Sequence, residues 1–147
     1  MKVTLECGEH IQSEEIIIKC RKMSDTIEKI VALASTSDQK LTGSIDRQIF
    51  ILDQQEVFYF ESVDDKVFIC TKEKVYDSPL RLYEIEKQFA GTSFFRANKS
   101  TIVNLSLVRS LNPILNGKIE IELENGEKQI VSRQYAPELK QKLGIGR

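Results

Sequence analysis

The sequence predicts a mainly β fold with few helices, and three observations lead to this prediction. Four segments rich in β-branched and aromatic residues follow one another at 48–52, 57–62, 66–71 and 74–77. Near the C-terminus, two Asn-Gly pairs lie between stretches that alternate apolar and polar residues, which is the strongest local signal for β-hairpins. Helical patterns, by contrast, are confined to a few short stretches.

The two Asn-Gly pairs, 116–117 and 125–126, predict a three-stranded meander. Its central strand carries Ile119, Ile121 and Leu123 on one face and three glutamates on the other. Because successive side chains of a strand point to opposite faces, one face of the meander should be buried and the other solvated. Both residues of each Asn-Gly pair are expected to adopt the positive φ of a type I′ turn.

Three helices are expected. The first is capped by Ser24 and Asp25, and the second has Ser78 as N-cap, Pro79 at its first position and Gly91 at its end. The third begins at Pro137. Two further strands are predicted at 2–7 and 15–20, so residues 1–45 form a small β-β-α element, separated by a hinge near 43–46 from a domain at 46–147.

Composition favours binding over catalysis. The chain has 147 residues, three cysteines and a single histidine, His10, which has no evident catalytic partner. Cys7 and His10 have C-x-x-H spacing, but the cysteines are expected to be reduced and structural. We expect no enzyme activity, cofactor, metal or small-molecule substrate, and, without a signal peptide or membrane span, a cytoplasmic location.

Charge is unevenly distributed along the chain. The net charge is −1, yet residues 96–147 hold nine Lys/Arg and five Asp/Glu, so they carry +4 and the rest carries −5. A basic C-terminal third behind an acidic front is typical of a localised surface that contacts an anion. Chance asymmetry is the other interpretation.

Two polar clusters interrupt segments that are otherwise suited to burial. The first holds Arg96, Asn98, Lys99 and Ser100, and the second, at 132–135, includes Arg133 and Gln134. Arginine can bind guanine through two hydrogen bonds, Asn and Gln can bind adenine or phosphate, and Lys and Ser can bind phosphate. The clusters are therefore candidate DNA contacts, although surface turns also carry such residues. The aromatic residues at 58–60 and 68 are expected to fill the core rather than stack on RNA bases.

Residues 46–144 resemble the LytTR DNA-binding domain family. The resemblance rests on FYFESVDDKVFI, SPLRLYEIEKQF, FFRANKSTIVNLSLVRSL and the closing NGKIEIELENGEKQIVSRQYAPELKQKLG, which occur in this order. It implies an elongated, multi-sheet β fold whose loops enter successive major grooves of double-stranded DNA at direct-repeat sites, with one protomer on each repeat.

The resemblance also implies roles for particular residues. Lys99 and Arg133 correspond to base-reading positions, and Arg96, Asn98, Ser100 and Gln134 would support them at the DNA backbone. A third contact comes from the turn after the E-S strand, often through a histidine; here Lys66 is the natural substitute.

Only about 45 residues precede this domain, too few for a receiver domain. The chain is therefore similar to the stand-alone subgroup of the family, which implies a homodimer on DNA and a small co-encoded membrane protein as inhibitor. The front element is either a cap on an exposed sheet edge or a surface for a dimer or partner. The alternative function is a protein-interaction module that binds a partner through its acidic face or sheet edges.

Overall fold

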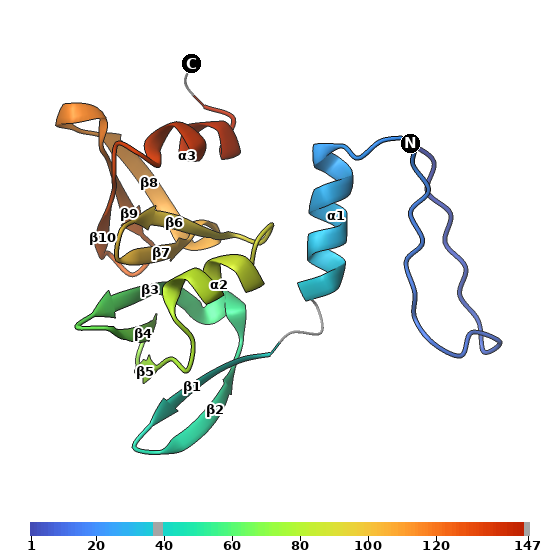
Figure 1. Cartoon of the computed structure of the whole chain (residues 1–147), viewed down its shortest axis with the longest axis horizontal. Coiled ribbons are helices and arrows are strands. Elements are labelled where there is room, and N and C mark those ends of the chain that lie inside the picture. Colours follow the sequence, from blue (N-terminus) through green and yellow to red (C-terminus); the bar gives the residue numbers. More distant parts are fainter. Residues whose placement is uncertain (37–39, 146–147) are drawn as a thin grey trace.

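The computed structural model describes residues 1–36 and 40–145, whose strands form two antiparallel sheets (Figure 1). The larger sheet has seven strands in the order β2-β1-β5-β4-β3-β7-β6, and the smaller has three in the order β10-β9-β8. The predicted mainly β fold is confirmed.

The structure assigns the following bounds to the strands and helices. The larger sheet contains β1 (Leu41–Ile45), β2 (Gln48–Leu52), β3 (Val57–Val63), β4 (Lys66–Thr71), β5 (Val75–Asp77), β6 (Phe94–Asn98) and β7 (Thr101–Asn104). The smaller sheet contains β8 (Val108–Pro113), β9 (Ile119–Leu123) and β10 (Lys128–Val131). The helices are α1 (Asp25–Thr36), α2 (Leu82–Gln88) and α3 (Ala136–Lys142), with single 3₁₀ turns η1 (Gln54–Glu56), η2 (Leu105–Leu107) and η3 (Leu115–Gly117).

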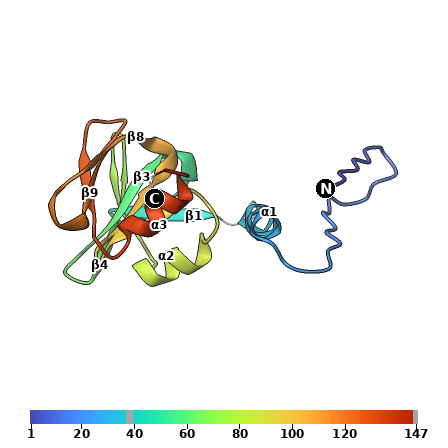
Figure 2. The same cartoon turned by 90° about the horizontal axis from the view of Figure 1, so that it is seen from above.

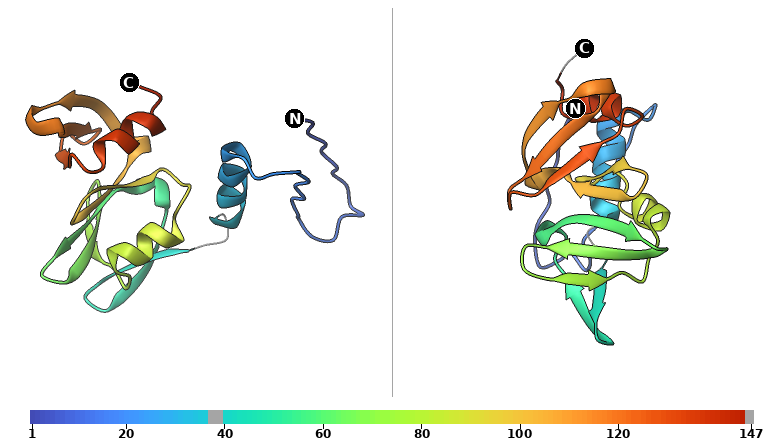
Figure 3. Two further views of the ribbon diagram at one scale, coloured as in Figure 1. Left: turned by 45° about the horizontal axis from the view of Figure 1, so that its top comes forward. Right: turned by 90° about the vertical axis from the view of Figure 1, so that its left-hand side faces the viewer.

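Two cores lie on opposite faces of the larger sheet. One packs α2, through Leu82, Ile85 and Phe89, against the sheet. The other packs the smaller sheet and α3 against strands β3, β6 and β7 (Figure 3). Phe94 and Phe95 are adjacent in β6 and serve one core each, because consecutive strand residues point to opposite faces.

A β-bulge in β3 directs its aromatic residues to both cores. The register with β4 shifts between Val57 and Tyr59, so Phe58 enters the core of the smaller sheet while Phe60 enters the core of α2. Phe58 and Phe60 are buried, as expected for core residues, whereas Tyr59 and Phe68 are half-buried.

The meander forms as predicted, with one difference at its second turn. Asn116 and Gly117 both have positive φ, and Ile119, Ile121 and Leu123 are buried. At the other turn only Gly126 has positive φ, whereas Asn125 accepts a hydrogen bond from the backbone N–H of Glu127. This turn is therefore not type I′, because the Asn125 side chain stabilises a turn in which only the glycine is left-handed.

The predicted hinge near residues 43–46 is instead part of a strand and its turn. Strand β1 pairs with β2 along its whole length, and Asp46 and Arg47 form the tight turn between them, both with positive φ. A Cβ on Gly43 would lie 2.7 Å from the Cβ of Tyr76, so this glycine allows the close approach of β5 rather than a bend. The sheet thus begins at Leu41.

Helix α2 begins later than Ser78 and Pro79 suggest. The Ser78 hydroxyl accepts a hydrogen bond from the Leu80 N–H and donates one to the Leu80 carbonyl, which closes a separate turn. The helix starts at Leu82, where its buried face begins, and Glu84 accepts a hydrogen bond from the N–H of Arg81. Gly91 follows the helix with positive φ, as expected.

The predicted strands at 2–7 and 15–20 are not formed. Nearly all their residues are exposed and neither segment pairs with a strand; an isolated hairpin without a buried face is only marginally stable. Helix α1 is confirmed, and Ser24 caps it through the N–H of Ile27. In Figures 1 and 2 this helix and the segment before it stand apart from the β body.

The cysteines are not paired. Cys7 and Cys20 are exposed and Cys70 is buried. In the described residues no group of three potential metal ligands occurs, and no helix there is long and apolar enough to cross a membrane.

Candidate nucleic-acid interface

Arg96 stabilises the β6–β7 turn through hydrogen bonds to the backbone of that turn. Its guanidinium donates to the carbonyls of Asn98 and Lys99, both at 2.7 Å, and lies 3.2 Å from a carboxylate oxygen of Glu86 on α2. Only 16% of its side chain is exposed. Its hydrogen-bonding groups therefore fix the shape of the turn and tie it to α2.

Asn98 connects the same turn to the smaller sheet. Its amide donates to the carbonyl of Ile130 in β10 at 2.8 Å, and its oxygen accepts from the backbone N–H of Ser100 at 2.9 Å. Nearby, the N–H of Ser132 donates to the carbonyl of Ala97 at 2.9 Å. These bonds place the two polar clusters side by side, although they lie more than 30 residues apart in the chain.

Lys99 and Ser100 stand at the exposed tip of the β6–β7 turn. The carbonyl of Ser100 accepts a hydrogen bond from the N–H of Ser62, at the end of β3. This bond links the tip to the β3–β4 hairpin, which carries Lys66.

Arg133 and Gln134 are exposed in the loop between β10 and α3, beside the β8–β9 turn. A Cβ on Gly117 would lie 2.9 Å from Cγ of Arg133, so the aliphatic part of the arginine rests on this glycine. Asn116, Lys118, Ser132, Arg133 and Gln134 line one shallow hollow. The first Asn-Gly turn of the meander therefore packs against the Arg133 side chain and supports it.

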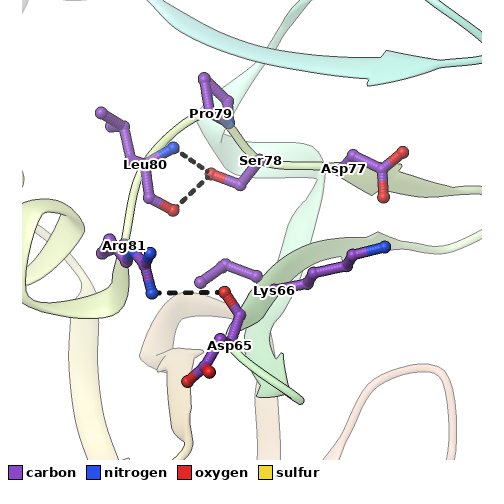
Figure 4. Close-up of a pocket in the computed structure, with 8 residues that line it drawn as sticks. Asp65, Lys66, Asp77, Ser78, Pro79, Leu80 and Arg81 are labelled. Atoms are coloured by element: carbon purple, nitrogen blue, oxygen red, sulfur yellow. Dashed lines mark hydrogen bonds between the residues drawn. The ribbon is translucent and has the colours of Figure 1, made fainter.

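Lys66 lies at the exposed end of the β3–β4 hairpin (Figure 4). The turn consists of Asp64 and Asp65, both with positive φ, a conformation that aspartate tolerates better than most residues. Arg81 donates to the carbonyl of Asp65 at 3.4 Å, and Figure 4 shows the Lys66 side chain extending away from it. The two aspartates are thus explained by the geometry of the turn.

We call residues 64–66, 98–100, 116–118 and 132–134 the turn surface. Its exposed cations are Lys66, Lys99, Lys118 and Arg133, and none makes an ion pair within the described residues. In contrast, Arg109 and Lys128 on the meander lie within 4.0 Å of glutamates. The turn surface therefore presents four cations outside any of these ion pairs, together with the two exposed carboxylates of Asp64 and Asp65 beside Lys66.

A half-buried polar contact joins the two sheets near the β9–β10 turn. Burial, together with hydrogen bonds to Glu127 and Cys70, raises the pKa of Tyr59 far above its usual value. Burial likewise raises the pKa of the Cys70 thiol to about 11. The phenol of Tyr59 therefore keeps its proton beyond the pH at which an ordinary tyrosine ionises, and the Cys70 thiol is a poor nucleophile.

The model of one protein family, the LytTr DNA-binding domain, matches residues 47–144. This span covers most of the β body, including all four turns of the turn surface. The chain belongs to the LytTR family. The family is one of DNA-binding domains, in agreement with the expectation of binding rather than catalysis.

A solved structure with the same LytTR fold is the LytTr DNA-binding domain of a Bacillus cereus protein described as a methyl-accepting/DNA response regulator. It has a TM-score of 0.69 and 25% identity, and the alignment covers 74% of this chain and 99% of that chain.

Relatives from Staphylococcus aureus strains NCTC 8325 and COL are described as uncharacterized HTH-type transcriptional regulators. Each is 31% identical over 99% of both chains. The described part of this LytTR chain has no helix-turn-helix, since strands separate α1, α2 and α3 from one another.

The structure brings most of the predicted site residues together. Lys99, Ser100, Arg133 and Gln134 are exposed on adjacent turns, and Lys66 joins them through the β3–β4 hairpin. Arg96 and Asn98 lie beneath them with their polar groups bonded inside the protein. Sequence reasoning missed Lys118 and the support that Gly117 gives to Arg133; the Asn-Gly pair predicted a turn there but not what packs against it.

Replacing Gly117 with alanine is expected to weaken specific DNA binding. Its φ of +75° costs an L-residue about 1–2 kcal/mol, and the new methyl must displace the flexible Arg133 side chain. Gly126→Ala is a matched control, because Gly126 has φ +89° with no atom within 4 Å of the added Cβ. Fluorescence anisotropy, on a DNA site selected from the genome for binding to the parent chain, should show weaker binding for Gly117→Ala alone. Equal losses in both variants would mean that Gly117 does not position Arg133.

Proposed function

We propose that this LytTR protein is a cytoplasmic transcription regulator that binds double-stranded DNA sequence-specifically through the turn surface. The observation that carries the proposal is the set of unpaired cations on turns that are held together by hydrogen bonds and by the packing of Arg133 on Gly117. Unpaired, exposed Lys and Arg favour phosphate contact, and fixed turns favour reading of base edges. The relatives described as transcriptional regulators support the regulatory role.

Within this proposal the turn surface enters successive major grooves of direct-repeat sites, with one protomer on each repeat, and Lys99 and Arg133 are the residues that read bases. Ser100, Gln134 and Lys66 contact the DNA backbone. Arg96 and Asn98 hold the reading turn in shape, since their polar groups are already bonded to protein atoms. A homodimer on DNA and a co-encoded membrane inhibitor complete the proposed mechanism.

The proposal is tested by selecting fragments from the whole genome that bind the full chain, followed by anisotropy titrations with excess random competitor. A specific regulator should bind its selected site at least about 10³-fold more tightly than random DNA. The affinity should fall steeply between two salt concentrations, because phosphate contacts release counterions. Binding that is equal for all fragments would overturn sequence-specific recognition.

The alternative, a module that binds a protein partner by strand addition, is favoured by one observation. Strand β2 pairs only with β1 in the described residues, so its outer edge is free. The two functions use different surfaces, because β2 lies at the opposite end of the sheet from β6 and its turn.

A further inference from the structure

Strand β2 exposes an apolar edge that the LytTR body leaves uncovered. Ile49 and Ile51 are each 73% exposed and point to the same side of this edge strand. An exposed, apolar edge strand invites pairing with another strand, and proteins normally cover or charge such edges. The central residues 49–52 carry no charge.

The same chain contains a segment suited to that edge. Residues 14–22, which we call the arm, include Ile16, Ile17 and Ile18 in a strand-forming run. Ile16 and Ile17 are 66% and 70% exposed, and the described chain supplies no hydrogen bond or ion pair to the arm. The arm thus lacks a partner strand, and the β2 edge lacks a neighbouring strand on its outer side.

Charge complementarity selects one orientation of the arm. The arm has acids before its isoleucines and bases after them: Glu14, Glu15, Lys19, Arg21 and Lys22. Around β2 the order is reversed, since the base Arg47 precedes the strand, although it shares its turn with Asp46, and the acids Asp53 and Glu56 follow it. Parallel pairing brings opposite charges together at the C-terminal end, whereas antiparallel pairing would gather four carboxylates there.

The parallel register also aligns the apolar residues. With Glu14 beside Arg47, Ile16 lies beside Ile49 and Ile18 beside Ile51, all on one side of the extended sheet. Cys20 then lies beside Asp53.

The fold does not favour pairing of the arm with the β2 edge of its own chain. Helix α1, with 12 residues, spans about 18 Å and stands between the arm and the β body in Figures 1 and 2. A second copy of the chain can exchange arms reciprocally, which gives a closed twofold dimer. We propose that this LytTR protein dimerises by adding the arm of each protomer, in parallel orientation, to the β2 edge of the other.

Cysteine cross-linking of the full chain tests the register directly. In a Cys7→Ser background the remaining native thiols are the exposed Cys20 and the buried Cys70. Asp53→Cys should form a disulfide-linked dimer with Cys20 under mild oxidation, above the level of the Cys7→Ser parent. Gln48→Cys, at the other end of β2, should not. A second pair, Glu14→Cys with Arg47→Cys in a chain lacking Cys7 and Cys20, should also cross-link between protomers.

The apolar contact has its own matched control. Ile51→Lys should abolish the cross-link and lower the dimer fraction in sedimentation, whereas Val75→Lys, on β5 and 56% exposed, should change neither. A disulfide within one chain, stronger cross-linking of Gln48→Cys, or no dimer above the parent level in either pair would overturn the proposal. None of these readouts depends on DNA binding, so the proposal stands or falls separately from the proposed function.

Discussion

Replacing Arg133 with alanine is expected to weaken binding to the selected operator by about 1–3 kcal/mol, or roughly 5- to 150-fold. Arg133 is exposed, makes no ion pair in the described residues, and has its aliphatic part resting on Gly117. A guanidinium held in this way can make two hydrogen bonds to guanine, which alanine cannot replace. Anisotropy titrations on the operator and on single-base variants would measure the loss of affinity and of sequence preference.

Arg109→Ala provides the control for loss of charge. Arg109 belongs to the same small sheet, but it lies at the start of β8, far from the β8–β9 turn, and donates to the carbonyl of Glu124. Its removal should leave the sequence preference unchanged. If Arg133→Ala weakened operator and random DNA alike, Arg133 would be a phosphate contact; if it weakened neither, the loop at 132–134 would lie outside the interface.

Local patterns predicted the elements whose formation depends on neighbours in the chain. Alternation in 119–123 fixed the buried face of β9, and the bounds of β2 and β4 agree with their apolar runs. The predictions failed where contacts between residues far apart in the chain determine the structure. Strand β1 was missed because Gly43 reads as a hinge unless the approach of Tyr76 is known.

The N-terminal isoleucine run shows the opposite failure. Its β propensity is high, yet a strand also requires a partner edge and a buried face, and the described residues of one chain provide neither. In the candidate site, sequence chemistry predicts Arg96 and Asn98 as DNA contacts, and that stays a prediction. Their bonds to Glu86 and Ile130, 10 and 32 residues away, are visible only in the fold.

Asn104 is the residue whose importance the sequence concealed most. It ends the FFRANKSTIVN segment on which the LytTR resemblance rests, and the residue is 1% exposed. Its oxygen accepts from the hydroxyl of Ser93 at 2.7 Å and from the N–H of Ser106 at 3.1 Å. Its amide donates to the carbonyl of Val57 at 2.9 Å. One side chain thus joins the starts of β3 and β6 to the end of β7.

Replacing Asn104 with alanine is therefore expected to lower the free energy of unfolding by about 2–3 kcal/mol, because buried polar groups lose their partners. Urea unfolding of the full chain should show a lower midpoint with an unchanged slope. The control is Asn112→Ala on the exposed side of β8, which should stay within about 0.5 kcal/mol of the parent. A similar midpoint for both variants would contradict the structural role of Asn104.

The Asn104→Ala variant also tests whether a loss of stability changes DNA recognition. Asn104 ends β7, whereas the turn that carries Lys99 and Ser100 precedes the start of that strand. Under conditions where Asn104→Ala remains folded, its preference for operator over random DNA should therefore match that of the parent chain. Arg133→Ala should show the reverse, with an unchanged urea midpoint and a lost preference, because an exposed side chain contributes little to stability. Loss of this preference in the folded Asn104 variant would mean that the hydrogen bonds of Asn104 also set the positions of the turns that carry Lys99 and Arg133.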